Sequence, residues 1–290
     1  MSNTEKTGIV MEGGGLRAIF TVGILDVLME NDIYVDGAVG VSAGACFGCN
    51  YKSKQIGRGL RYNLAFCDDK RYSGLESFLK SGDAFNADFC YNQIPNKFDP
   101  FDYKAFKENP MEFYMVCTDV LTGKAVYKKA DEMNPSNLEW MRGSATIPLA
   151  GRIVRVDGRK LLDGGVSDSI PLKFMINRGY KKNIVIKTQP DGYVKKKNRF
   201  TPLVRYVYKQ YPALVRAVAN RHKMYNETLD YIVDMEKEGR CLVLAPDAEL
   251  GIGNMEKDPE NVLRGYLHGR EVASRNLDVI KKYLGIPLIS

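Results

Sequence analysis

The first fifty residues alternate between short apolar stretches and turns of small residues, and this alternation limits the fold more than any other feature. Residues 8–11 predict a buried strand, which is followed by three glycines and by the helical apolar periodicity of residues 16–30. Residues 35–41 predict a second strand, and the small residues after it predict a second helix. This order favours an α/β fold with a mostly parallel sheet that carries helices on its faces.

The remainder of the chain predicts further strands and helices, and it contains no linker long enough to separate two domains. Strands are expected at residues 112–120, 124–127, 153–156, 159–162, 183–187 and 241–245, and helices at 171–178 and 261–283. Residues 51–109 predict helices and loops that cover the sheet. We therefore expect a single domain over residues 1–290, with a motif-bearing core at about 8–187, a basic helical segment at 191–236 and a closing strand and helix at 237–290.

The composition excludes several classes of protein. A chain of 290 residues with 44% apolar and 27% charged residues is typical of a globular protein, so disorder is excluded as the main state. No stretch of about 18 residues is apolar throughout, and the N-terminus lacks a basic stretch followed by an apolar one. We expect a cytoplasmic protein, with peripheral contact with the inner face of the membrane as an option.

The six cysteines predict reduced thiols that fill core space, because no secretory signal is visible. Cys46 and Cys49 form a C-x-x-C pair, which alone is a weak signal for redox chemistry or for half of a zinc site. No second pair exists, and the only histidines, His222 and His268, lie far along the chain. We expect no metal and no cofactor.

The positive charge is concentrated in one stretch. Residues 181–225 hold twelve Lys and Arg against a single acid, Asp191, which gives a net charge of +11. Such a stretch indicates an anionic partner, either a membrane surface or nucleic acid, or else a solvated helix face. Residues 203–218 show apolar side chains at helical spacing with basic ones between them, which suits an anionic lipid interface or a helix packed on the protein's own core.

Three short motifs supply the parts that acyl transfer needs. Gly13, Gly14 and Gly15 lie between a strand and a helix, where free N–H groups form an anion hole. Ser42 is the centre of a G-x-S-x-G turn at residues 40–44, which exposes a serine hydroxyl at a strand-to-helix corner. Asp163 ends a hairpin strand and is followed by two glycines. Separately, these residues also suit a dinucleotide loop, a helix cap and an ordinary turn.

The order of the three motifs predicts an oxyanion hole, a nucleophile and a base. A serine–histidine–aspartate triad would need His222 or His268, and neither lies in a strand-end loop, so a Ser42–Asp163 dyad fits better. Arg17 either adds positive potential near the hole or is a surface residue. A nucleotide-binding enzyme is disfavoured, because it needs an acid at the end of the second strand, whereas Asp36 stands at the beginning of that strand.

The motifs resemble those of the patatin-like phospholipases, and residues 162–171 are similar to the bacterial branch of that family. The pattern G-G-G-x-R-G, G-x-S-x-G and D-G-G reads here as residues 13–18, 40–44 and 163–165, with Ala18 in place of the last glycine. Residues 143–149 resemble the family's small-residue and proline segment. The resemblance implies a three-layer α/β/α fold, Ser42 as nucleophile, Asp163 as base and an oxyanion hole lined by Gly13, Gly14 and Gly15.

We therefore expect a lipid acyl ester hydrolase of the phospholipase A or lysophospholipase type. Its partners would be a lipid or another acyl ester and, through the basic segment, an anionic membrane; no nucleic acid is expected. The alternative is a non-catalytic module that binds anionic lipid or nucleic acid through residues 181–225, and this alternative leaves the ordered Gly, Ser and Asp motifs without a role.

Overall fold

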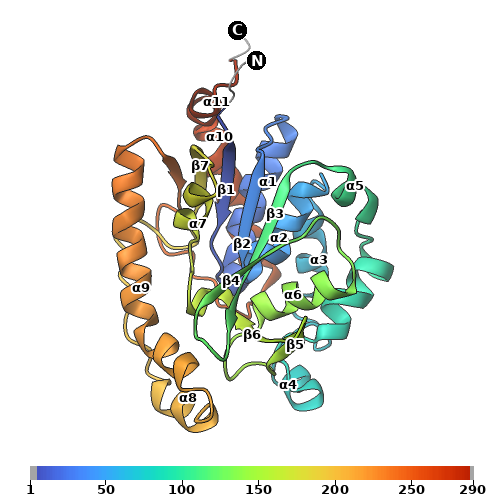
Figure 1. Cartoon of the computed structure of the whole chain (residues 1–290). Coiled ribbons are helices and arrows are strands. Elements are labelled where there is room, and N and C mark those ends of the chain that lie inside the picture. Colours follow the sequence, from blue (N-terminus) through green and yellow to red (C-terminus); the bar gives the residue numbers. More distant parts are fainter. Residues whose placement is uncertain (1–4, 288–290) are drawn as a thin grey trace.

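The computed structural model describes residues 5–287 and has one mixed sheet between two layers of helices (Figure 1). The strands are β1 Thr7–Met11, β2 Gly37–Val41, β3 Glu112–Asp119, β4 Ala125–Lys129, β5 Val154–Val156, β6 Arg159–Asp163, β7 Lys182–Ile186 and β8 Cys241–Leu244. The α-helices are α1 Ile19–Glu30, α2 Ala43–Lys52, α3 Arg58–Phe66, α4 Leu75–Ser81, α5 Tyr103–Glu108, α6 Pro135–Ala145, α7 Leu172–Asn177, α8 Thr201–Val207, α9 Pro212–Lys237, α10 Pro259–Arg275 and α11 Leu277–Leu284. The three-layer α/β/α architecture and the mostly parallel sheet are confirmed.

The sheet has the order β5-β6-β3-β2-β1-β7-β8, and β4 also pairs with β3. The five strands from β3 to β8 along this order are mutually parallel, whereas β4, β5 and β6 run antiparallel to their neighbours. β1 is central, and its residues pair with β2 on one side and with β7 on the other. Because parallel strands end at the same edge, the turns after β1 and β2 lie next to each other.

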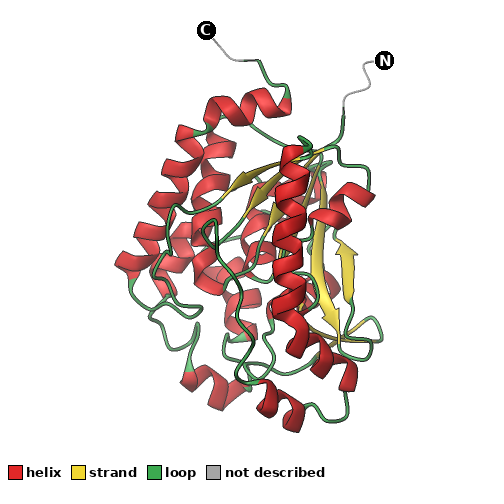
Figure 2. Cartoon of the chain, turned by 90° about the vertical axis from the view of Figure 1, so that its left-hand side faces the viewer, coloured by secondary structure: helices red, strands yellow, loops and turns green. Residues whose placement is uncertain are grey.

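The two helical layers follow from the alternation of side chains along the buried strands. Ile9 and Met11 of β1 face the layer that contains α1, α2, α6 and α10, whereas Val10 faces α7 and α9. Both faces are covered, which is why the central strands are apolar almost throughout. Figure 2, in which the left-hand side of Figure 1 faces the viewer, shows the long helix α9 in front of the strands.

Two helical predictions need correction, and one helix was missed. The helix expected over residues 203–218 is divided into α8 and α9, because Pro212 begins α9 and a proline cannot continue the preceding helix. The closing helix expected over residues 261–283 is divided at Asn276 into α10 and α11. Helix α6 was not predicted, although Asn134 caps its first turn and Pro135 occupies the first helical position.

The basic segment packs on the core of the protein along most of its apolar stripe. Val204, Tyr208, Tyr211, Leu214, Val215 and Val218 are buried in one cluster with Val120, Leu162 and Val166. Leu203 and Val207 of α8 remain about half exposed, at 49% and 47%. Among the described residues, no helix is long and apolar enough to cross a membrane.

Candidate active site

Ser42 lies at the sharp turn between β2 and α2. Its backbone has φ 56° and ψ −126°, a conformation that a residue with a side chain rarely adopts and that costs about 1–3 kcal/mol. The turn is fixed from outside, because the Ser42 N–H donates to Ser144 Oγ at 3.0 Å and the Ser144 hydroxyl donates to the Val116 carbonyl at 2.6 Å. Sequence analysis did not single out Ser144, although it lies in the small-residue segment 143–149.

The glycines beside Ser42 are needed because other backbone passes very close. A Cβ atom on Gly40 would lie 2.5 Å from the backbone of Ala45, and one on Gly44 would lie 2.5 Å from the Met11 carbonyl oxygen. Contacts of this length between non-bonded atoms do not occur. The glycines therefore allow α2 to begin directly against the end of β1.

The loop of Gly13, Gly14 and Gly15 joins β1 to a short 3-10 helix at Gly15–Ala18. A Cβ atom on Gly13 would lie 2.9 Å from Ser42 Cβ, so the loop passes directly against the serine. Among the described residues, the N–H groups of Gly13 and Gly14 donate to no protein acceptor. These N–H groups are available as donors to an oxyanion beside the Ser42 hydroxyl.

Glu12 anchors this glycine loop. Its buried carboxylate accepts from the Thr188 N–H at 2.6 Å and from the Tyr225 hydroxyl at 2.7 Å. The Thr188 hydroxyl in turn donates to the Gly13 carbonyl at 3.0 Å. Sequence analysis missed Glu12, and the only signal was an acid at the end of an apolar strand.

Asp163 ends β6 and is buried next to Ser42. Its Oδ1 atom accepts from the Gly165 N–H at 2.7 Å, and the carboxylate lines the polar side of the site together with Ser42. Burial raises the pKa of Asp163 above its usual value, while the Arg221 guanidinium, the nearby Ser42 side chain and the Gly165 N–H oppose this increase. A buried carboxylate with a raised pKa is a better proton acceptor than an exposed one.

Two pockets of different character meet at Ser42. Both are lined by Gly15, Ser42 and Ile147. The first pocket is apolar, encloses about 940 Å³ of space that is partly open to solvent, and is walled by side chains of α2, α3, α6 and the segment 85–103, such as Phe47, Tyr62, Phe85, Tyr91, Phe101 and Met141. The second pocket is polar and contains Asp163 and the glycine loop.

The polar pocket is also lined by three cationic side chains, Arg17, Lys195 and Arg221. Arg17 donates to the side-chain oxygen of Asn254 at 2.9 Å, and the Arg221 Nε–H donates to the Gly165 carbonyl at 2.5 Å. Arg17 thus lines the same pocket as the glycine loop, and its contribution of positive potential there stays a prediction. Lys195 and Arg221 lie within the basic segment, but their sequence gave no signal that distinguishes them from their neighbours.

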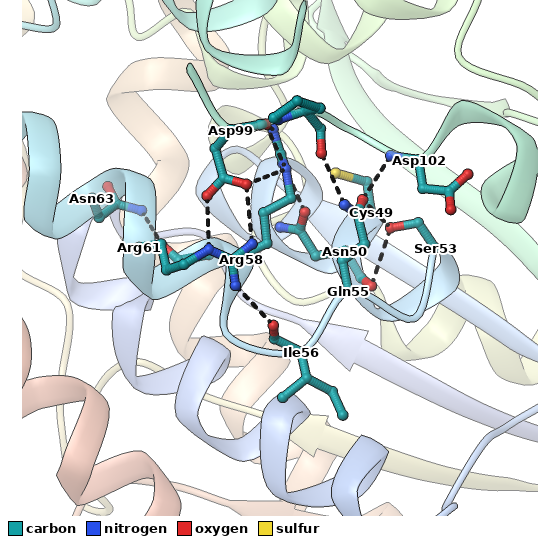
Figure 3. Close-up of polar contacts among 12 residues, drawn as sticks. Cys49, Asn50, Ser53, Gln55, Ile56, Arg58, Arg61, Asn63, Asp99 and Asp102 are labelled. Atoms are coloured by element: carbon teal, nitrogen blue, oxygen red, sulfur yellow. Dashed lines mark hydrogen bonds and ion pairs between the residues drawn. The ribbon is translucent and has the colours of Figure 1, made fainter. Parts of the chain in front are cut away.

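A buried arginine stiffens the wall of the apolar pocket (Figure 3). The Arg58 guanidinium donates to Asn50 Oδ1 at 2.8 Å, and to the Asp99 carbonyl oxygen from Nε at 3.1 Å and from Nη2 at 2.8 Å. It also lies 5.3 Å from the ring centroids of Tyr62 and Phe101. These contacts join α2 and α3 to the end of the segment 89–99, which also lines the apolar pocket.

The remaining candidate residues do not join the site as reactive groups. Cys46 and Cys49 line the apolar pocket as free thiols, and burial raises the pKa of Cys46 to about 12 and that of Cys49 to about 11. Few thiolates would therefore form near neutral pH. His222 lines a third pocket, which shares Tyr193, Lys195 and Arg221 with the polar pocket but does not include Ser42. His268 lies against the Phe20 ring, so neither histidine lines a pocket with Ser42.

Comparisons with known proteins place most of the chain in one family. The family model described as patatin-like phospholipase matches residues 9–176, more than half of the chain, and a model described as a domain of unknown function (DUF6363) matches residues 211–285. The chain is 26% identical over 202 residues to "Uncharacterized protein YjjU" of Escherichia coli, covering 64% of this chain and 52% of that protein. It is 25% identical over 306 residues to lysophospholipase NTE1 of Coccidioides immitis, covering 98% of this chain and 18% of that protein.

The matched regions are parts of longer proteins. An uncharacterized NTE family protein of Mycobacterium bovis is 23% identical over 171 residues, which cover 59% of this chain and 46% of that protein. This chain thus spans about half the length of the bacterial relatives and a smaller share of the fungal one. Among solved structures, VipD from Legionella pneumophila matches with a TM-score of 0.48 and 13% identity, over 95% of this chain and 67% of that chain.

Proposed function

Because this chain belongs to the patatin-like phospholipases, we propose that it cleaves lipid acyl esters with Ser42 as nucleophile and Asp163 as base. One observation carries the proposal: Ser42, on a strained strand-to-helix turn, lies beside the Asp163 carboxylate and the glycine loop where an apolar pocket meets a polar one. An ester bond at this junction would have its acyl chain on the apolar side and its alcohol on the polar side.

The reaction would proceed through an acyl-enzyme. The Ser42 oxygen forms a bond to the ester carbon while its proton passes to Asp163, and the carbonyl electron pair moves to the oxygen that faces the glycine loop. The bond to the alcohol then breaks, and the alcohol takes the proton from Asp163. Water repeats the sequence on the acyl-enzyme, so that the products are one carboxylic acid and one alcohol.

The charges around the dyad support this sequence of steps. Burial raises the pKa of Asp163, which makes the carboxylate more basic, and the Arg221 guanidinium keeps it ionised by opposing that increase. The N–H groups of Gly13 and Gly14, which donate to no acceptor among the described residues, would stabilise the developing oxyanion, and each such donor is typically worth ~3–4 kcal/mol. All of these contributions come from the chain's own residues.

The substrate would be a phospholipid or a lysophospholipid at a membrane face. The apolar pocket suits an acyl chain, and one relative is named a lysophospholipase. Figure 1 places α4 and α8 at the same end of the molecule, and both helices expose apolar side chains, among them Leu75 and Leu79 of α4 and Tyr206 of α8. With the basic residues of α8 and its neighbours, this end would contact an anionic bilayer.

We also propose that residues 1–290 act as one folding unit. Strands β7 and β8 lie beyond the segment that matches the phospholipase model, yet they extend the same parallel sheet beside β1. Thr188 and Tyr225, which hold Glu12 below the glycine loop, also lie beyond that segment. The loop would therefore lose its support in a shorter chain.

The test is covalent labelling with a fluorophosphonate, followed by intact mass and peptide mapping. We expect one adduct on Ser42 in the wild type, none in Ser42→Ala and strongly slowed labelling in Asp163→Asn. Ser136→Ala is a matched control, since Ser136 lies on the surface side of α6, where its hydroxyl donates to Asp157. Absence of any adduct on folded wild-type protein, with and without detergent micelles, would contradict the proposal and favour the binding module.

A further inference from the structure

The polar pocket contains more positive charge than the dyad needs. Arg17, Lys195 and Arg221 all line it, and none of the three forms an ion pair with a carboxylate among the described residues. The two acids of the pocket have other partners: Glu12 accepts from Thr188 and Tyr225, and Asp163 accepts from Gly165 and contacts Ser42. The cations are therefore left facing the space beside Ser42.

Bringing these cations together is electrostatically costly. Lys195 is held in place by its backbone, whose N–H donates to Asn226 Oδ1 at 2.9 Å, and its ammonium lies 4.5 Å from the Tyr225 ring centroid. Burial and the nearby Arg221 lower the pKa of Lys195 to about 8. An anion in the pocket would offset the mutual repulsion of these cations.

The position of the cations identifies the kind of anion. The polar pocket shares Gly15, Ser42 and Ile147 with the apolar pocket, so a ligand that fills both has its ester at Ser42. The part of the ligand on the polar side is then the alcohol that leaves. In a glycerophospholipid this alcohol carries a phosphate a few bonds from the ester, which is the anion that arginine and lysine side chains bind best together.

We infer that Lys195 and Arg221, with Arg17, form a subsite for the phosphate of the substrate's head group. The inference rests on the proposed function, because it names the substrate class of the same site. Lys195 and Arg221 both lie outside the segment that matches the phospholipase model, so this part of the chain would set the preference for a phosphate-bearing ester over a neutral one. Arg221 would have two roles, since it also contacts Gly165 beside the base.

The test compares two substrates that differ only in the phosphate, oleoyl lysophosphatidic acid and mono-oleoylglycerol, presented in the same neutral detergent micelles. We expect the wild type to favour the phosphate-bearing ester in kcat/KM, and Lys195→Met to reduce that preference about tenfold, mainly through KM. Lys195→Arg keeps the charge and is expected to keep most of the preference. Lys197→Met is the matched control, because Lys197 is exposed and lines neither pocket, and it is expected to leave the preference unchanged.

A binding measurement separates this inference from the proposed function. Calorimetric titration of the Ser42→Ala protein with glycerol 3-phosphate, glycerol and inorganic phosphate requires no turnover. We expect binding of glycerol 3-phosphate that Lys195→Met weakens and Lys197→Met does not. Binding of inorganic phosphate with equal strength would point to free phosphate as the ligand and overturn the head-group assignment. Hydrolysis of both esters with equal kcat/KM would overturn the proposed phosphate subsite but leave the proposed hydrolase activity standing. Binding of glycerol 3-phosphate without hydrolysis of either ester would overturn the hydrolase activity but leave the anion-binding site.

Discussion

Replacing Gly44 by alanine is expected to damage the active site while leaving the fold in place. The added Cβ atom would lie 2.5 Å from the Met11 carbonyl oxygen and 2.8 Å from that of Glu12, so the start of α2 and the end of β1 must move apart. Overpacking of this kind costs about 1–3 kcal/mol, against which alanine regains about 1 kcal/mol of helix propensity. The net loss of stability is therefore about 0–2 kcal/mol.

The effect on activity should be much larger than the effect on stability. Met11 and Glu12 lead directly into the glycine loop, and Gly44 follows Ser42 by two residues, so the forced separation falls between the nucleophile and the oxyanion donors. A displacement of about 1 Å at such a place lowers kcat by about 100-fold. The assay is steady-state hydrolysis of a short-chain ester, together with urea denaturation to measure the free energy of unfolding.

Gly48→Ala is the matched control on the same helix. Its Cβ atom would meet the Sδ and Cε atoms of Met11, the far part of a flexible side chain that can turn aside without moving the backbone. We expect Gly48→Ala to keep kcat within a few-fold of the wild type. Full activity of Gly44→Ala, or equal losses in the two variants, would refute the reasoning that the backbone contact sets the distance between Ser42 and the glycine loop.

Four further outcomes are expected. Activity should fall as the pH drops through the raised pKa of Asp163, because only the ionised carboxylate accepts the proton. Arg221→Gln should raise that pKa further and move the acid limb of the pH–activity profile to higher pH. Arg216→Gln, on the exposed side of α9, should leave the profile unchanged. Ser144→Ala removes the acceptor of the Ser42 N–H and should lower the unfolding free energy by about 1–3 kcal/mol in urea denaturation. Arg58→Met leaves the partly buried Asp99 carbonyl and the buried Asn50 amide oxygen without their donor. It should lower the free energy of unfolding by about 2–4 kcal/mol and with it the thermal midpoint, which an unchanged melting temperature would contradict. Tyr206→Asp should reduce co-sedimentation with phosphatidylglycerol vesicles relative to wild type, and equal sedimentation would exclude α8 from the contact.

The strands and the three motifs could be predicted from the sequence because their signals are local. An apolar run followed by small residues specifies a buried strand and a tight turn, and the parallel arrangement then brings the turns after β1 and β2 to one edge. Two missed features also had local signals, since Pro212 marks the break between α8 and α9, and Asn134 with Pro135 marks the start of α6. The rest of the polar pocket had no such signal. Lys195 and Arg221 differ from the ten other cations of residues 181–225 only in the direction that their side chains take, and this direction depends on how α9 packs.

The polar pocket shows why the motif-bearing segment is not sufficient for the site. The serine, the aspartate and the glycine loop all lie between residues 13 and 165, but a loop of three glycines has little conformational preference of its own. Its position depends on Glu12, whose two hydrogen-bond donors come from the end of β7 and from α9. Asn254, between β8 and α10, holds the other side, because it accepts from the Leu16 N–H at 3.1 Å and from Arg17. The same distant segments supply Lys195 and Arg221. In the mechanism that we propose, fixing the oxyanion donors and selecting the head group are therefore two consequences of packing the basic segment against the end of the sheet.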